Sequence, residues 1–241
     1  MKKRGLVFAL SMVMVLSAVI LSGCGEKTDR TPADQTVSGD EFTSGSEGGE
    51  ELPVVIPGES APEETAVNSL DTSSLLTGIH HARIEVADYG TIDVELDADT
   101  APITVTNFVK LAQEGFYDGL TFHRIISGFM IQGGDPNGNG TGGSDEKITG
   151  EFNSNGVENN ISHVRGTISM ARSQDPNSAS SQFFIMHNKA DYLDGEYAGF
   201  GHVTNGMDVV DKICENAHPT DSNGTIPQEE QPSIESIVIL D

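Results

Sequence analysis

The sequence is poor in cysteine and in basic residues. Its 241 residues include two cysteines, Cys24 and Cys214, and if Cys24 carries a lipid then no intramolecular disulfide can form. Cys214 lies in a helical pattern and is expected to be a buried apolar residue. The 37 aspartates and glutamates outnumber the 13 lysines and arginines, for a net charge of −24. Phosphate binding requires a basic face, so we expect no nucleic-acid partner.

Motifs for metal or nucleophilic chemistry are also missing. The seven histidines form no H-E-x-x-H or comparable spacing, and no G-x-S-x-G elbow occurs. His80, His81 and His123 are therefore interpreted as strand or surface residues rather than ligands. These absences argue against a metal site and against a hydrolase.

A long hydrophobic run is missing as well. The apolar stretch Leu6–Leu21 follows a basic start and is too short for a comfortable membrane span. Leu21-Ser22-Gly23-Cys24 resembles a bacterial lipobox, whose cleavage leaves Cys24 as a lipid-modified N-terminal residue; an ordinary secretory signal with an incidental cysteine is the alternative. Two or more acyl chains anchor a protein stably. We therefore expect a signal peptide over residues 1–23 and a mature protein anchored on the extracytoplasmic face of the cell membrane.

Residues 24–78 have a different composition from the rest of the chain. They are rich in Asp, Glu, Ser, Thr, Gly and Pro, and contain too few large apolar residues to offset the entropy of ordering. We expect a disordered tether, with a reach of roughly 40 Å if it behaves as a flexible chain. Val54–Pro57 is its one apolar island, either a docking motif or a chance cluster. Residues 79–241 have the length of one domain.

Alternation of apolar and polar residues dominates this domain. His81–Asp97 predicts two strands around a tight turn at Asp88–Gly90. Thr100–Gly115 predicts a helix with Thr100 as N-cap, Pro102 in its first turn and Gly115 at its end. Further patterns predict short strands within residues 120–126, 128–134, 166–172, 181–187 and 199–204, a second helix at Met207–Asn216, and a last strand at Ser233–Leu240. Many short strands with two helices favour an antiparallel barrel or sandwich.

The loop Gly134–Glu146 matches two motifs at once. A calcium-loop spacing is satisfied by Asp135, Asn137, Asn139, Gly140 and Glu146, and a dinucleotide-turn spacing by Gly138, Gly140 and Gly143. A calcium hand needs a helix on each side of its loop, whereas a strand-like run precedes this one and no helical periodicity follows. A dinucleotide turn must open directly into a helix. We interpret the loop as a glycine-rich surface loop that binds neither ligand.

Three blocks of the domain resemble the cyclophilin-type peptidyl-prolyl isomerases. They are FHRIISGFMIQGGDPNGNGTGG (Phe122–Gly143), SMARSQDPNSASSQFFI (Ser169–Ile185) and YLDGEYAGFGHV (Tyr192–Val203), in the family's order and spacing. The resemblance implies a mainly β fold, a closed eight-stranded antiparallel barrel capped by two α-helices. A barrel of that size fills its interior with side chains, so we expect the active site on the outside.

The implied reaction is rotation about an X-Pro peptide bond, against a barrier of roughly 18–20 kcal/mol. It requires no nucleophile, metal or cofactor. Arg124 is the predicted catalytic residue. As the bond twists, the prolyl nitrogen gains a lone pair, and a guanidinium donor aimed at it stabilises the twisted state more than the planar one. A strand arginine in a surface ion pair is the alternative interpretation.

Four apolar residues are placed around the proline ring by the resemblance: Phe129, Met130, Phe184 and Leu193. Barrel core is the alternative for each. Adjacent Phe183 and Phe184 must face opposite sides of a strand, so one can fill the barrel while the other lines an outer groove. The resemblance assigns the groove to Phe184.

Polar substrate-binding residues are assigned in the same way. Gln132 and Gln182 suit substrate carbonyls, and Ala171 and Arg172 lie in the segment that meets an extended peptide through its backbone. Arg172 replaces a common asparagine, which matters less if only the backbone makes the contact.

Two aromatic residues depart from the family's pattern. Tyr192 stands where many members carry tryptophan, and Tyr197 where many carry histidine. Tyr192 keeps an aromatic wall but replaces the indole donor, so the sequence does not predict whether cyclosporin binds. Tyr197 can still pack and hydrogen-bond, with an altered substrate preference.

We therefore expect a membrane-tethered, monomeric prolyl isomerase that acts on proline-containing segments of exported proteins. A cyclophilin-like module that holds such segments with little turnover is one alternative, and a calcium-binding lipoprotein, resting only on the glycine-rich loop, is another. The retained Arg124, Phe129, Gln132 and Phe184 favour the enzyme.

Overall fold

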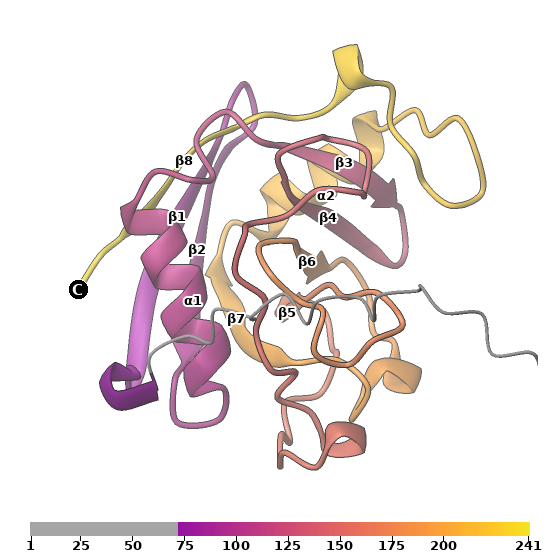
Figure 1. The fold of residues 1–241 in the computed structure, drawn as a ribbon. Coiled ribbons are helices and arrows are strands. Elements are labelled where there is room, and N and C mark those ends of the chain that lie inside the picture. The colour runs from indigo at the N-terminus through magenta and orange to yellow at the C-terminus, as the bar shows by residue number, and fades with distance from the viewer. Residues whose placement is uncertain (1–71) are drawn as a thin grey trace, which may run out of the picture. The chain divides into compact units, whose positions relative to one another are not determined.

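Eight antiparallel strands form one curled sheet in the computed structural model, which describes residues 72–241 (Figure 1). Along the sheet the order is β3 (Thr121–Ile126), β4 (Met130–Asp135), β6 (Phe183–Met186), β5 (Thr167–Met170), β7 (Gly199–Asn205), β2 (Gly90–Asp97), β1 (Ile79–Val86) and β8 (Ile234–Ile239). Each predicted strand is present, within a few residues of its expected bounds. The expected signal peptide, Cys24 and most of the expected tether lie outside the described residues.

The hydrogen-bond ladder of the sheet does not close. Its edge strands, β3 and β8, are joined by an isolated bridge between Thr121 and Ser233 rather than by a ladder. Residues 224–226 occupy the rest of the β3 edge: Ile125 N donates to Gly224 O (2.8 Å) and Ile226 N donates to His123 O (3.0 Å). Because this loop takes the backbone groups that β8 would need, the prediction of a closed barrel is wrong and the fold is an open half-barrel.

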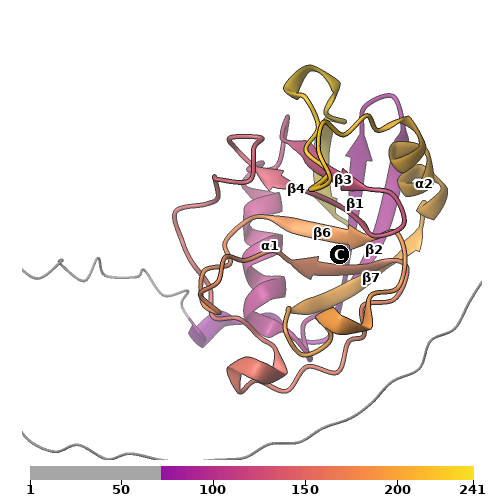
Figure 2. The same cartoon turned by 90° about the vertical axis from the view of Figure 1, so that its right-hand side faces the viewer.

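Two α-helices accompany the sheet, α1 (Pro102–Gln113) and α2 (Met207–Asn216). They lie apart from each other in both views (Figures 1 and 2), α1 against β8 and β2, and α2 against β2. The bounds of α2 are those predicted, and Cys214 is buried on its apolar face as expected. No helix within residues 72–241 is long and apolar enough to cross a membrane.

The start of α1 differs from the prediction. Thr100 is not its N-cap, because the Thr100 hydroxyl donates to the Asp97 carboxylate (2.7 Å) and no side chain at the N-cap position bonds to the helix. The carboxylate of Glu151 accepts the free N–H groups of Ile103 (2.9 Å) and Thr104 (2.7 Å) instead. A distant anion thus satisfies the helix N-terminus and its dipole.

The interior of the half-barrel is filled with side chains. Ile84, Val94 and Leu96 are buried on the inner faces of β1 and β2, as the alternation predicts. The Phe108 ring on α1 lies 5.5 Å from the ring of Phe183 and 5.3 Å from that of Phe200. A functional cavity therefore has to lie on the outside.

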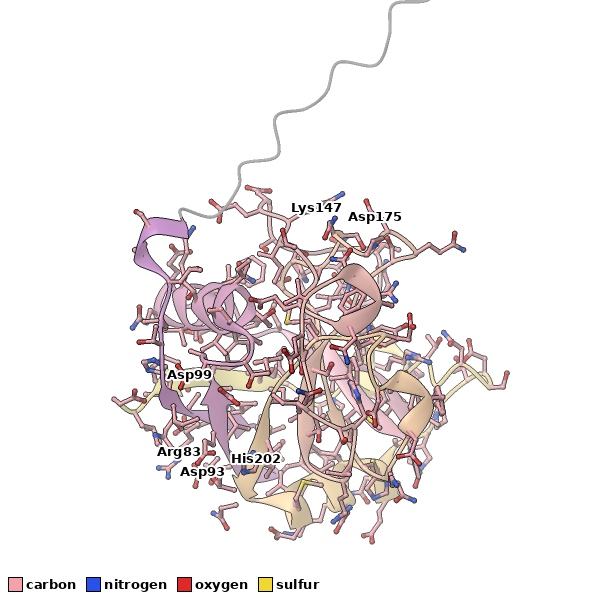
Figure 3. All side chains as sticks on the ribbon, turned by 90° about the horizontal axis from the view of Figure 1, so that it is seen from below. Arg83, Asp93, Asp99, Lys147, Asp175 and His202 are labelled. Atoms are coloured by element: carbon pink, nitrogen blue, oxygen red, sulfur yellow. The ribbon has the colours of Figure 1, made fainter. Side chains whose placement is uncertain are left out.

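Charged pairs lie on the outer face of the half-barrel. Arg83 on β1 is directly opposite Asp93 on β2, and its Nε donates to the Asp93 carboxylate (2.7 Å); Figure 3 labels both residues. Such exposed pairs contribute little to stability.

Candidate active site

A cavity of about 410 Å³ lies on the outer face of the half-barrel. Its lining comprises ten of the eleven residues predicted for the site: Arg124, Phe129, Met130, Gln132, Ala171, Arg172, Phe184, Tyr192, Leu193 and Tyr197. The eleventh, Gln182, lines an adjoining cavity of about 340 Å³, which shares Gln132, Ala171 and Arg172 with the first. Lys147, labelled in Figure 3, also lines this second cavity. Segments far apart in the chain are thus gathered at one place.

Strand register aligns the key side chains of the cavity. Arg124 on β3 pairs with Gln132 on β4, and Gln132 pairs with Phe184 on β6. Paired residues on neighbouring antiparallel strands project to the same face. The pleat sends Phe183 into the main core, while Phe184 joins a separate outer cluster with Met130 and Leu193. The predicted division between the two phenylalanines is confirmed.

Arg124 is held by hydrogen bonds rather than by an ion pair. Its Nε donates to Asn223 O (2.7 Å) and one Nη donates to Gln132 Oε1 (3.1 Å). Within residues 72–241 it has no carboxylate partner at ion-pair distance, which removes the alternative of a surface salt bridge for this part of the chain. Burial lowers the pKa of the guanidinium, although arginine stays charged in proteins. The remaining N–H groups are donors available to a ligand in the cavity.

A relay of two amides orients Gln132. Its Nε2 donates to Gln182 Oε1 (2.9 Å), and Gln182 Nε2 donates to Gly142 O (2.7 Å). Because Gln132 Nε2 is occupied, its Oε1 is directed to Arg124. Gln182 therefore lies behind Gln132 and also connects the glycine-rich loop to the cavity.

The apolar part of the cavity has a buried floor and aromatic walls that are half-buried or exposed. Met130, Phe184 and Leu193 are buried, whereas Tyr192 is 70% exposed. The Phe129 and Tyr192 rings stack with centroids 6.1 Å apart, and Tyr197 packs edge-on against Phe184 at 5.9 Å. A small apolar ring could enter against this floor and be flanked by aromatic side chains.

Arg172 contributes its side chain as well as its backbone. The guanidinium lies 5.0 Å from the ring centroid of Phe152 and 4.7 Å from that of Tyr197, and donates from Nη to Glu196 O (2.8 Å). The replacement of asparagine at this position therefore adds a support for Tyr197. Ala171 N donates to Gln182 O (2.9 Å), so an incoming peptide can use the Ala171 carbonyl but not its amide.

Sequence reasoning missed His163. This buried residue makes ring contacts to Asp194 through Nδ1 (3.0 Å) and to Ser169 through Nε2 (3.0 Å), and it stacks on Phe184 with centroids 6.0 Å apart. Burial lowers the pKa of His163, and Asp194 partly opposes the shift. His163 thus fixes both the Phe184 ring and the segment that carries Leu193. No spacing in the sequence signals this role, because the partners are distant in the chain.

The glycine-rich loop is closed by its own first carboxylate. Asp135 is buried and accepts the backbone N–H groups of Asn137 (2.8 Å), Asn139 (3.0 Å) and Gly140 (2.5 Å). Glu146 pairs with Lys110 (2.9 Å). β4 enters the loop and no α-helix follows it, so neither a calcium hand nor a dinucleotide turn is formed. No group of three potential metal ligands is arranged around an ion within residues 72–241.

Comparisons with known proteins agree on one family. Residues 81–239 match the family model of the cyclophilin type peptidyl-prolyl cis-trans isomerases. A peptidyl-prolyl cis-trans isomerase of Synechococcus elongatus is 53% identical over 112 residues, which cover 46% of this chain and 72% of the relative. A probable isomerase of Brucella suis is 41% identical over 160 residues, covering 61% and 78%.

Solved structures give the same result. A cyclophilin-type isomerase of Cryptosporidium parvum superposes with a TM-score of 0.60 at 31% identity, covering 68% of this chain and 99% of that one. A second structure of it, in the presence of the dipeptide Ala-Pro, has a TM-score of 0.59 at 32% identity, with coverages of 67% and 99%.

Proposed function

Because the chain belongs to the cyclophilin-type peptidyl-prolyl cis-trans isomerases, we propose that it isomerises X-Pro peptide bonds in the 410 Å³ cavity. Arg124 is the proposed catalytic residue. The observation that carries this assignment is the setting of Arg124. Its guanidinium is fixed by Asn223 O and Gln132 beside an apolar floor. A fixed donor beside the site for a small apolar ring is what a twisted prolyl bond requires.

Binding would start with the proline ring on the floor formed by Met130, Phe184 and Leu193. The twisting bond would then lie beside Arg124, whose donor stabilises the lone pair that appears on the prolyl nitrogen. This interaction is strongest in the twisted state, so it lowers the barrier rather than merely tightening binding. No cofactor is needed, because the bond order of the C–N bond is the only chemical obstacle.

Recognition of the flanking peptide would fall to polar groups around the floor. Gln132 and the Ala171 carbonyl suit the backbone of an extended chain, with Gln182 orienting Gln132. Arg172 and Tyr197 would bound the cavity on one side and Phe129 with Tyr192 on another. Their side chains set the room available beside the proline.

The cellular role we propose is to assist folding of exported proteins, as a monomer anchored through Cys24 on the extracytoplasmic face of the cell membrane. The lipobox-like Leu21-Ser22-Gly23-Cys24 supports this proposal. Cys24→Ser is expected to move the full chain from the membrane to the soluble fraction. Retention of the variant on membranes after a salt wash would contradict anchoring through this residue.

Isomerisation of a chromogenic X-Pro peptide, followed with and without EDTA, tests the enzymatic proposal. We expect catalytic turnover that EDTA leaves unchanged. Peptide binding without acceleration would identify a holding module instead. Loss of activity in EDTA, restored by calcium, would contradict a cofactor-free mechanism and revive the calcium site of the glycine-rich loop.

A further inference from the structure

His187, the residue after β6, lies behind the turn that presents Phe129 to the cavity. Its Nδ1 accepts the backbone N–H of Gly128 (2.8 Å). Its own N–H and that of Asn188 both donate to Phe129 O (2.9 Å and 3.2 Å). The Ser127–Gly128 peptide and the Phe129–Met130 peptide are therefore both tied to the end of β6.

The hydrogen bond from Gly128 N–H selects one tautomer of the His187 imidazole. A backbone N–H can only donate, so His187 Nδ1 must be the unprotonated nitrogen. In a neutral ring the proton then lies on Nε2, which is 3.0 Å from Asp211 Oδ1 and donates to it. Asp211 on α2 thereby orients the ring so that Nδ1 meets Gly128.

Arg165 secures this arrangement from the other side. One Nη of Arg165 donates to the Asp211 carboxylate (2.8 Å), and the other donates to His187 O (2.9 Å). The side chain and the backbone of His187 are thus both connected to Arg165, and the turn before β4 is connected to helix α2. His187 itself is largely shielded, with a side chain that is 19% exposed.

The half-buried Phe129 ring packs against the outer cluster that contains Met130, Phe184 and Leu193, and it stacks on Tyr192. Ser127 and Gly128 in its turn are exposed, and the stacking partner of its ring, Tyr192, is itself largely exposed. The turn backbone sets where the ring leaves the chain: Gly128 has a φ of 80°, and Phe129 N donates to Ile126 O (2.9 Å).

We propose that His187 is a positioning residue for substrate binding, which sets Phe129 against the proline ring by accepting the Gly128 N–H in its Nε2-protonated form. The inference rests on the proposed contact between Phe129 and the proline. His187 does not line the cavity and acts through Phe129. Its contact with Asp211 serves to orient the ring for the contact with Gly128.

Two variants separate the two bonds of the imidazole. In His187→Asn, the amide oxygen replaces Nδ1 as the acceptor for Gly128, and the Asp211 contact is lost. In His187→Gln, the amide can reach Asp211, and the Gly128 acceptor is lost. We expect His187→Gln to raise KM for an X-Pro peptide about 3- to 10-fold with kcat nearly unchanged, because a uniform binding contact is weakened. His187→Asn should keep KM within about twofold of the wild type.

Nuclear magnetic resonance on the full chain supplies a readout that does not depend on activity. The ring nitrogen shifts of wild-type His187 should show Nε2 protonated and Nδ1 as acceptor. The Gly128 amide should exchange with solvent faster in His187→Gln than in His187→Asn. A proton on Nδ1, or equal exchange rates and equal KM values in the two variants, would overturn the inference.

Phe129→Ala distinguishes failure of this inference from failure of the proposed site. If that variant raises KM while His187→Gln does not, the inference alone is rejected. If Phe129→Ala leaves KM unchanged, the proposed contact with proline is rejected and the role of His187 falls with it.

Discussion

The guanidinium of Arg172 lies over the ring of Tyr197, with 4.7 Å between the Arg172 Cζ and the ring centroid. The Arg172 Cζ also lies 5.0 Å from the ring centroid of Phe152, and one Nη donates to Glu196 O (2.8 Å). A cation over the face of an aromatic ring stabilises the contact by about 0.5–2 kcal/mol. One side of the proposed cavity therefore depends on a residue whose side chain sequence reasoning treated as incidental.

Arg172→Ala should lower kcat/KM for an X-Pro peptide about 3- to 10-fold, because the Tyr197 ring loses the cation that keeps it in position beside the cavity. Arg172→Lys is the matched variant, since it keeps the charge but loses the planar fork. We expect it to fall between the wild type and Arg172→Ala. Equal kcat/KM in all three proteins, measured with matched thermal stability, would show that Tyr197 needs no such support.

Arg124→Ala should reduce kcat about 10²- to 10³-fold, the loss expected for one strong electrostatic donor. The circular dichroism spectrum should stay native, because the side chain lies outside the main core. Arg124→Lys keeps a positive charge without the rigid fork and is expected to recover only part of the activity. Wild-type turnover in a folded Arg124→Ala protein would remove Arg124 from the mechanism.

Stability should fall as the pH drops from about 7.5 to 5, in part because of His163. Burial lowers the pKa of this histidine in the folded protein, so below the unfolded-state value of about 6.5 the unfolded chain binds more protons than the folded one. Urea unfolding at several pH values checks this. The pH dependence should be shallower in His163→Gln, which has no proton to gain. Because burial also lowers the pKa of His123, a residual slope is expected in the variant.

Glu151→Ala should destabilise the fold by about 0.5–2 kcal/mol, because the Ile103 and Thr104 N–H groups lose their acceptor. Glu151→Gln keeps one acceptor and removes the charge, so its loss should be smaller. Burial raises the pKa of Glu151 in the folded protein, so ionisation of this carboxyl group lowers the free energy of unfolding as the pH rises. This cost offsets part of its capping contribution. Chemical unfolding at neutral pH would refute the capping role if both variants matched the wild type.

The sequence predicted those features that local patterns control. Alternation and short β-like runs located the eight strands, and the adjacent phenylalanines 183 and 184 had to face opposite sides. The three blocks resembling cyclophilins placed ten residues that the structure gathers around one cavity. Each of these inferences depends on neighbouring residues or on a resemblance that already contains the register.

Contacts between distant segments escaped prediction. The cap of α1 comes from Glu151, 47 residues beyond Thr104, so the prediction of the nearby and chemically suitable Thr100 is wrong. His163 meets Asp194 across 31 residues, and His187 meets Gly128 across 59. Closure of the sheet also could not be predicted, because it depends on which distant segment takes the backbone groups of β3.

Residues 224–226, which bond to the backbone of β3, also protect the protein from aggregation while it folds. An exposed edge strand is a template on which another chain can add, and a half-barrel that does not close has such edges. At β3 the loop beside it prevents this, and Gly224 permits the close approach: its φ is +85°, and a Cβ there would lie 2.7 Å from Ile125 O and 2.5 Å from Ile126 Cγ1. A larger residue at position 224 would push the loop outward and leave β3 open to strand exchange between molecules.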